Sequence, residues 1–161
     1  MALVVSDANV FIDLEEGGIL SPLFRLPEAI AVPDVLFEEE LRDRHAHLLE
    51  LGLRVLVVKE RGVERAVALA AQYRKPNRND LFALALAEQE SCPLLTGDRF
   101  LREAAVAEGV TVHGTLWVTE RMVVTRALPA ARLRPAYARM REAGRRLPWG
   151  KVEALLERLG A

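Results

Sequence analysis

The chain has 161 residues and a formal net charge of −1, and its composition, 51% hydrophobic and 6% aromatic, predicts a single domain over residues 1–161. The opening stretch MALVVS lacks the basic start of a signal peptide, and no run approaches the roughly 20 apolar residues that span a bilayer, so we expect a cytoplasmic protein that does not enter membranes. A single cysteine, Cys92, excludes an internal disulfide and a cysteine-based zinc motif.

The near-zero net charge conceals two oppositely charged parts of the chain. Residues 1–120 carry 12 basic and 20 acidic side chains, a net of −8, whereas residues 121–161 carry 10 basic and 3 acidic side chains, a net of +7. A basic segment of this kind can contact nucleic acid, pair with an acidic surface in a dimer, or remain solvated. Charge alone leaves these three interpretations open.

The first third of the chain is predicted to form two strand–helix units. The apolar run ALVVS predicts a strand at 2–6, and ANVFIDLEEG has helical spacing over 8–17 and ends at a glycine pair. A second strand is predicted at 29–32. One long helix is expected from the stretch 33–52, with Gly52 just past its end.

The same alternation continues to residue 112. Two amphipathic helices follow the third strand, the first ended by Lys75-Pro76 and the second beginning near Asn79. The stretch CPLLT predicts a strand that runs directly into a helix. In chain order these later elements are a strand at 54–58, helices at 60–74 and 79–91, a strand at 92–96, a helix at 97–109 and a strand at 110–112.

The strands are mostly short and apolar without a polar alternation, which is typical of a parallel sheet covered by helices on both faces. We therefore predict an α/β fold, a three-layer α/β/α sandwich with a central, mostly parallel sheet, over residues 1–118. Beyond this core, Pro129, Pro135 and Pro148 are expected to divide residues 119–161 into short helices. These helices would form a basic C-terminal extension of the same domain.

Four acidic sources fall where such a sheet binds ligands. Asp7 and Asp98 each follow a predicted strand, at the carboxyl edge where open parallel sheets bind their ligands. Asp80 begins a helix, and the run from Glu38 to Glu40 lies in the helix after the second strand. Taken singly, each aspartate is a typical helix cap and the glutamates are a typical solvated face. Only their combination indicates a shared site.

Clustered carboxylates repel one another, and this repulsion restricts what such a site can bind. Two unit charges ~4 Å apart cost about 1 kcal/mol in water and about 4 kcal/mol at an effective dielectric of 20. The cluster therefore needs protons or cations, and Mg²⁺ typically combines carboxylate ligands with a substrate phosphate. Zinc is not indicated, because His45 and His47 are two residues apart and point away from a common helix face.

Several stretches resemble the motifs of PIN-domain nucleases and, among these, the VapC-type toxins of bacterial and archaeal toxin–antitoxin pairs. The resemblance covers nearly the whole chain and implies a PIN-like fold. The C-terminal stretch RPAYARMREAGRRLPWGKVEALLERLG also resembles the helical ending of a PIN subgroup of unsettled function. The stretches that match the family's acidic motifs are VVSDANVFIDL, VPDVLFEEEL, NDLFALALAEQ and PLLTGDRFLREAAVAEGVTVHGTLWV.

The resemblance assigns metal-binding and catalytic roles to an acidic quartet. It places Asp7, Asp80 and Asp98 on the metal-binding aspartates of the family. The glutamate most in phase with the preceding proline is Glu39, and Glu40 is the alternative. The stretch TGD supplies one acid where many relatives have two, so the number of metal ions held at this corner stays open.

Polar and basic residues around the quartet receive supporting roles. Asn9 and Thr96 are similar to polar residues that the family places near the metal. Arg78, Arg99 and the arginines of the C-terminal extension are candidates for binding RNA phosphates, with a solvated side chain as the alternative for each.

The same resemblance implies a Mg²⁺- or Mn²⁺-dependent endoribonuclease with one or two ions, in which a metal-activated water hydrolyses the RNA phosphodiester bond. It also implies a homodimer and a small cognate antitoxin that inserts a basic side chain into the acidic cleft.

Three other interpretations remain beside the nuclease. A PIN-like module that binds RNA or protein, with weak or no cleavage, would have little need of an intact acidic quartet. Phosphoryl transfer to an aspartate, as in receiver or phosphatase domains, also places Asp7 after the first strand, but DANVF lacks the second aspartate of the phosphatase pattern and no acidic pair precedes it. In the third interpretation the aspartates are helix caps of an inert domain, which the extent of the resemblance argues against.

Overall fold

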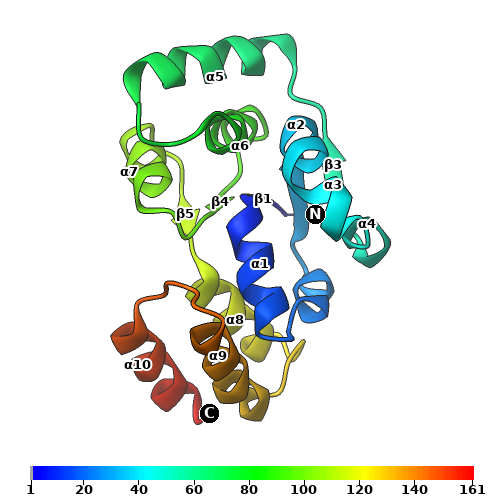
Figure 1. Ribbon diagram of the computed structural model, residues 1–161, viewed down its shortest axis with the longest axis vertical. Coiled ribbons are helices and arrows are strands. Elements are labelled where there is room, and N and C mark those ends of the chain that lie inside the picture. The colour runs from blue at the N-terminus through cyan, green and yellow to red at the C-terminus, as the bar shows by residue number, and fades with distance from the viewer. Residues whose placement is uncertain (1) are drawn as a thin grey trace.

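The computed structural model describes residues 2–161 and contains a five-stranded, all-parallel sheet in the order β3-β2-β1-β4-β5 (Figure 1). After β1 the chain adds β2 and then β3 on one side of β1, and later adds β4 and β5 on the other side. The direction in which successive strands are added therefore reverses between β1 and β4. Ligands of open parallel sheets bind outside the carboxyl ends at such a reversal. The strands are β1 Leu3–Ser6, β2 Ala29–Pro33, β3 Arg54–Leu56, β4 Leu94–Leu95 and β5 Val112–His113.

Helices surround this sheet, which confirms the predicted α/β class. The helix α6 (Arg78–Gln89) is buried from Leu81 to Ala87 and packs on β1, β2 and β4. The helix α5 (Glu60–Gln72) packs on α6 as an outer layer, while α7 (Arg99–Ala107) contacts β5. From the end of β1, α1 (Ala8–Glu16) runs toward the C-terminal helices (Figure 1).

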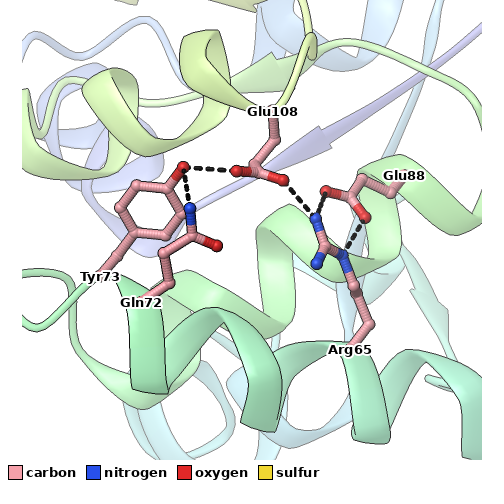
Figure 2. A network of polar contacts seen from close by, with 5 residues as sticks. All are labelled: Arg65, Gln72, Tyr73, Glu88 and Glu108. Atoms are coloured by element: carbon pink, nitrogen blue, oxygen red, sulfur yellow. Dashed lines mark hydrogen bonds and ion pairs between the residues drawn. The ribbon is translucent and has the colours of Figure 1, made fainter.

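A network of polar contacts among five residues holds α5 against the neighbouring helices. The Arg65 Nε of α5 lies 2.8 Å from Glu88 Oε2 of α6, and its Nη2 lies 2.5 Å from Glu108 Oε1 at the end of α7. The Tyr73 hydroxyl donates to the other oxygen of Glu108, and Gln72 approaches that hydroxyl (Figure 2). The network joins three helices near the amino end of the sheet, away from the acidic residues described below.

The long helix expected over 33–52 is wrong in detail, because the segment is broken. Before β2, and outside this segment, the chain forms a short 3-10 helix, η1 (Ser21–Arg25). After β2 the backbone N–H of Arg42 bonds to the carbonyl of Phe37, five residues back, which makes a wide π turn. A second break at 46–47 brings His45 and His47 to Glu15 of α1, with nitrogen–oxygen distances of 3.3 and 3.7 Å. The pieces are α2 Asp34–Leu36, the π turn Phe37–Leu41, α3 Arg42–His45 and α4 Leu48–Leu51.

Short helices follow the last strand, as the prolines predict, with one exception. Pro129 and Pro148 directly precede helices, but Pro135 lies in the first turn of a helix instead of dividing two. In a first turn the missing N–H of proline costs no helical hydrogen bond, so the prediction that Pro135 breaks the chain is wrong. The C-terminal elements are α8 Thr115–Val124, η3 Ala130–Arg132, α9 Leu133–Glu142 and α10 Trp149–Leu159.

Among residues 2–161, two partly buried ion pairs and the more exposed Arg158–Glu120 pair join this basic C-terminal segment to the acidic part of the chain. The Arg121 Nη2 lies 2.5 Å from Glu28 Oε1, and the Arg145 Nε lies 2.6 Å from Asp13 Oδ1. Asp13 is 5% exposed, and its second oxygen accepts a 2.9 Å hydrogen bond from the Thr115 hydroxyl. Part of the opposite charge of the two segments is therefore neutralised by ion pairs within one chain. Within residues 2–161, none of the helices combines the length and the apolar character that crossing a membrane requires.

We expect Arg145→Ala to lower the free energy of unfolding by about 2–4 kcal/mol, because it leaves the Asp13 carboxylate buried without its cation. Urea denaturation measures the loss. Arg158→Ala is the matched control, since its pair with Glu120 is 58% and 35% exposed and such a pair is worth under about 1 kcal/mol. Equal losses in the two variants would show that the Asp13–Arg145 contact does not anchor the C-terminal segment.

Candidate active site

Asp7 lies at the carboxyl end of the central strand and is both a helix cap and a buried acid. Its Oδ1 accepts a 3.2 Å hydrogen bond from the Val10 N–H at the start of α1, and its Oδ2 accepts from the Thr96 hydroxyl. Only 1% of the residue is exposed. The pKa of Asp7 is raised to about 7, mainly by burial and to a smaller extent by the charges of Asp80 and Asp13, while these hydrogen bonds partly offset the rise.

Thr96 connects this aspartate to a second one. The buried Thr96 hydroxyl donates to Asp7 and accepts a 3.0 Å hydrogen bond from the backbone N–H of Asp98. Asp98 in turn caps α7, because its Oδ1 accepts a 2.8 Å hydrogen bond from the Leu101 N–H. The two carboxyl-edge aspartates predicted from the sequence are therefore brought together, with Thr96 between them.

Asp80 lies in the first turn of α6, and its charge interacts with the other acids. It forms a capping box with Asn77, in which the Asn77 N–H donates to Asp80 Oδ2 at 3.1 Å and the Asp80 N–H donates to Asn77 Oδ1 at 2.8 Å. Burial raises the pKa of Asp80 to about 6, and the charges of Asp98 and Glu40 contribute to the rise. Asp80 is thus the acid through which Asp7, Asp98 and Glu40 are electrostatically linked.

Glu39, the glutamate chosen by helical phase, is instead occupied by neighbours from α6. It pairs with the Arg78 guanidinium and accepts a 3.0 Å hydrogen bond from Asn79 Nδ2, and the Arg78 contact lowers the Glu39 pKa. The adjacent Glu40 is the glutamate whose charge acts on Asp80. Both lie in the π turn, where the wider turn changes the angular position of each residue relative to an α-helix. The angular positions of these two glutamates, counted from Pro33 with α-helical turns, therefore do not apply in this segment.

As they stand, these side chains do not form a closed metal cage. Within residues 2–161, no group of three or more histidine, cysteine, aspartate or glutamate residues is arranged to hold a metal ion. Each of the three aspartates uses at least one carboxylate oxygen in its own helix start, and Glu40 is exposed. The donor atoms nevertheless fit a hard divalent cation in kind, since they are carboxylate oxygens, and burial together with neighbouring acids raises the pKa of Asp7 and Asp80.

A cavity of about 310 Å³ opens beside Asp98. The exposed Asn9 of α1 contributes to its wall, together with residues from the loop that joins α9 to α10. Asp13 and Arg145 form another part of the wall; the sequence analysis did not select Asp13, and it included Arg145 only among the C-terminal arginines as a candidate for RNA phosphates. The cavity is lined by Asn9, Asp13, Gly97, Asp98, Gly144, Arg145 and Arg146.

Two of the residues selected from the sequence lie outside this arrangement. Arg78 pairs with Glu39, and the exposed Arg99 pairs with Glu103 one turn further along α7 at 3.0 Å. A signal for Asp13 was present, because it stands between the buried Val10 and Leu14 on the apolar face of its helix. Its partner Arg145 is 132 positions away, and no local pattern indicates it.

Comparison with known proteins gives one family and a fold. A family model described as a PIN domain matches residues 3–161. No curated protein matches the sequence significantly. The chain is similar to VapBC2 from Rickettsia felis bound to a DNA fragment from their promoter, with a TM-score of 0.51 and 11% identity over 70% of this chain and 98% of that one. It is also similar to a toxin–antitoxin complex from Klebsiella pneumoniae, with a TM-score of 0.47 and 23% identity over 61% and 87%.

Proposed function

The chain belongs to the PIN-domain family, and from this membership and its acidic site we propose that it is a divalent-metal-dependent endoribonuclease. The observation that supports the proposal most directly is the electrostatic linkage of four acids at the point where the strand order reverses. Asp7, Asp98 and Glu40 all interact through Asp80, and the pKa values of Asp7 and Asp80 are raised to about 7 and 6. Helix caps also gather at this edge of a parallel sheet, so the support comes from the interaction among the acids and not from their position alone.

We assign the metal-binding role to Asp7, Asp80 and Asp98, with Glu40 in preference to Glu39 as the fourth acid. Mg²⁺ or Mn²⁺ bound there, as one or two ions, would lower the pKa of a water molecule and stabilise negative charge on the leaving oxygen. Thr96 would keep the Asp7 carboxylate in one orientation through its hydroxyl.

Basic residues on the wall of the site would bind the RNA strand. Arg146 lines the cavity beside Asp98 and forms no ion pair within residues 2–161, so it can contact a phosphate that flanks the cleaved bond. Arg99 follows Asp98 in the chain but pairs with Glu103, and it would have to leave that pair to bind RNA. Asn9 lines the same cavity and would hydrogen-bond to water or substrate there. Arg78 is the weaker candidate, because Glu39 already neutralises it.

We further propose that residues 1–161 act as one domain, in which the core 1–118 and the basic extension 119–161 are joined by the Glu28–Arg121 and Asp13–Arg145 pairs. By analogy with the VapBC2 complex, the chain would be the toxin of a toxin–antitoxin pair, a homodimer restrained by a cognate antitoxin. A PIN-like binding module with weak or no cleavage is the second candidate, and the lack of a preformed metal cage within residues 2–161 favours it.

The test is cleavage of a single-stranded RNA in Mn²⁺ compared with EDTA, for the parent chain and for the two glutamate variants. We expect Glu40→Gln to slow Mn²⁺-dependent cleavage about 10- to 100-fold, because it removes a charge that acts on Asp80. Glu39→Gln should leave the rate within about threefold, since its carboxylate already pairs with Arg78.

The two glutamines are matched in size, exposure and helical position, so each variant is the control for the other. A large loss of cleavage rate in Glu39→Gln with no loss in Glu40→Gln would show that Glu39, and not Glu40, is the fourth acid. Binding of RNA without cleavage in any divalent cation would support the binding module and contradict the nuclease.

A further inference from the structure

A second, larger hollow lies next to the cavity beside Asp98. It encloses about 680 Å³ between α7, the turn from β5 into α8, and the start of α10. Gly97 and Arg146 line both hollows, so the two adjoin at the residue that precedes Asp98. A Cβ atom built on Gly97 would meet no other atom within 4 Å, which leaves this junction open. We call this larger hollow the basic groove.

Two aromatic rings form part of the groove wall. The His113 and Trp117 rings stack with centroids 4.1 Å apart and planes 7° from parallel, and both side chains are half-buried. Burial and the nearby Arg102 charge lower the His113 pKa, so the imidazole is neutral at physiological pH. The pair is therefore a flat ring surface in a hollow that is otherwise lined by cations and by apolar side chains such as Leu116 and Leu147.

Three cations surround these rings without being neutralised. Arg102 of α7, Arg146 of the α9–α10 loop and Lys151 of α10 are exposed and line the groove. Within residues 2–161 none of the three forms an ion pair, whereas Arg121 and Arg145 of the same C-terminal segment are paired with buried or half-buried acids. Unpaired cations around a ring surface suit a ligand with regularly spaced anions and flat bases.

We propose that the basic groove binds single-stranded nucleic acid, with one unpaired base stacked on the His113–Trp117 pair and the adjoining phosphates on Arg102, Arg146 and Lys151. The strand would continue past Gly97 to the acids, so the assignment rests on the proposed nuclease function and names a subsite of its substrate. A duplex does not fit this role, because its bases are already stacked on one another and cannot lie on the rings.

The first experiment measures binding without cleavage. A fluorescein-labelled 12-nucleotide oligoadenylate RNA is titrated with the full chain in EDTA, and its affinity is followed by fluorescence anisotropy. We expect His113→Leu to weaken binding about tenfold and His113→Phe to retain it, because only the ring is needed. Removing Arg102, Arg146 or Lys151 with alanine should reduce the salt dependence of log Kd by about one unit each.

Arg44→Ala is the matched control for the cations. Arg44 is an exposed arginine of α3 for which no ion pair is found within residues 2–161, and it lies outside the groove. Its replacement should change neither the affinity nor the salt dependence. The same oligoadenylate annealed to its complement should bind less well than the single strand and should be indifferent to His113→Leu.

The second experiment detects stacking directly and needs no change to the groove. The chain has two tryptophans, so Trp149→Phe leaves Trp117 as the sole indole emitter. Adding the oligoadenylate should quench Trp117 fluorescence, with a midpoint at the Kd from anisotropy. Binding without quenching, or groove variants that bind as the parent does, would overturn the groove assignment.

Failure of this assignment is distinguishable from failure of the nuclease. Mn²⁺-dependent cleavage that is unaffected by the groove variants refutes the groove and leaves the nuclease intact. Binding that depends on His113 in a chain that never cleaves RNA supports the groove and refutes the nuclease.

Discussion

Replacement of Asp98 by asparagine is expected to lower Mn²⁺-dependent RNA cleavage by at least about a hundredfold, while the melting temperature stays the same or rises. Asparagine can keep the cap, because its side-chain oxygen accepts from the Leu101 N–H as Asp98 Oδ1 does at 2.8 Å. It cannot keep the charge that binds a divalent cation, and it removes repulsion from Asp80. The variant therefore separates the two roles that the structure gives this residue.

The measurement combines the initial rate of RNA cleavage with thermal unfolding of the same samples. Asp34→Asn is the matched control, because Asp34 also follows a strand and opens a helix but accepts from the Val58 N–H. It should retain the parent's rate. If Asp98→Asn also retains it, Asp98 is a cap only and its assignment as a metal ligand is wrong.

The aspartates were predictable from sequence because local rules place them. A carboxylate that follows a short apolar strand and opens a helix satisfies a cap, and parallel strands collect all such positions at one edge. Asp7 and Asp98 occur as these rules predict, each capping the next helix. The rules could not decide between cap and ligand, because both readings require the same position.

The glutamate could not be assigned from the sequence for a physical reason. The phase argument assumes 3.6 residues per turn, whereas Phe37 accepts from an N–H five residues ahead. The wider turn shifts the angular positions of Glu39 and Glu40 from those that an α-helical count gives. Nothing in FEEEL distinguishes this wider turn from an ordinary α-helical one.

Contacts between distant segments could likewise not be predicted from the sequence. Arg145 meets Asp13, and α10 completes the groove beside His113 and Trp117, only after the C-terminal helices have packed onto the rest of the chain (Figure 1). The charge difference between the two parts of the chain left a nucleic-acid contact, a dimer contact and a solvated face open as interpretations. It did not indicate which arginines are consumed by ion pairs and which are left to meet a ligand.

The metal-free protein is expected to lose stability as pH rises from about 4 to about 7. The pKa values of Asp7 and Asp80 are raised to about 7 and 6 in the folded chain from an ordinary value of 3.8, so the folded state binds more protons than the unfolded state across this interval. Stability falls with pH wherever the folded state holds the extra protons, and it levels off once both groups are ionised.

Asp7→Asn should remove most of that loss, because asparagine keeps the cap to Val10 and has no proton to release. The free energy of unfolding in EDTA at pH 8 is expected to rise by on the order of 2 to 4 kcal/mol relative to the parent, with little difference at pH 4. Urea denaturation from pH 4 to 8 measures this difference. Mn²⁺ at pH 8 should stabilise the parent and not the variant, since the cation takes the place of the protons. A parent and variant with parallel pH profiles would mean that Asp7 is not strained by its buried charge, and the electrostatic reason for a cation at this corner would be lost.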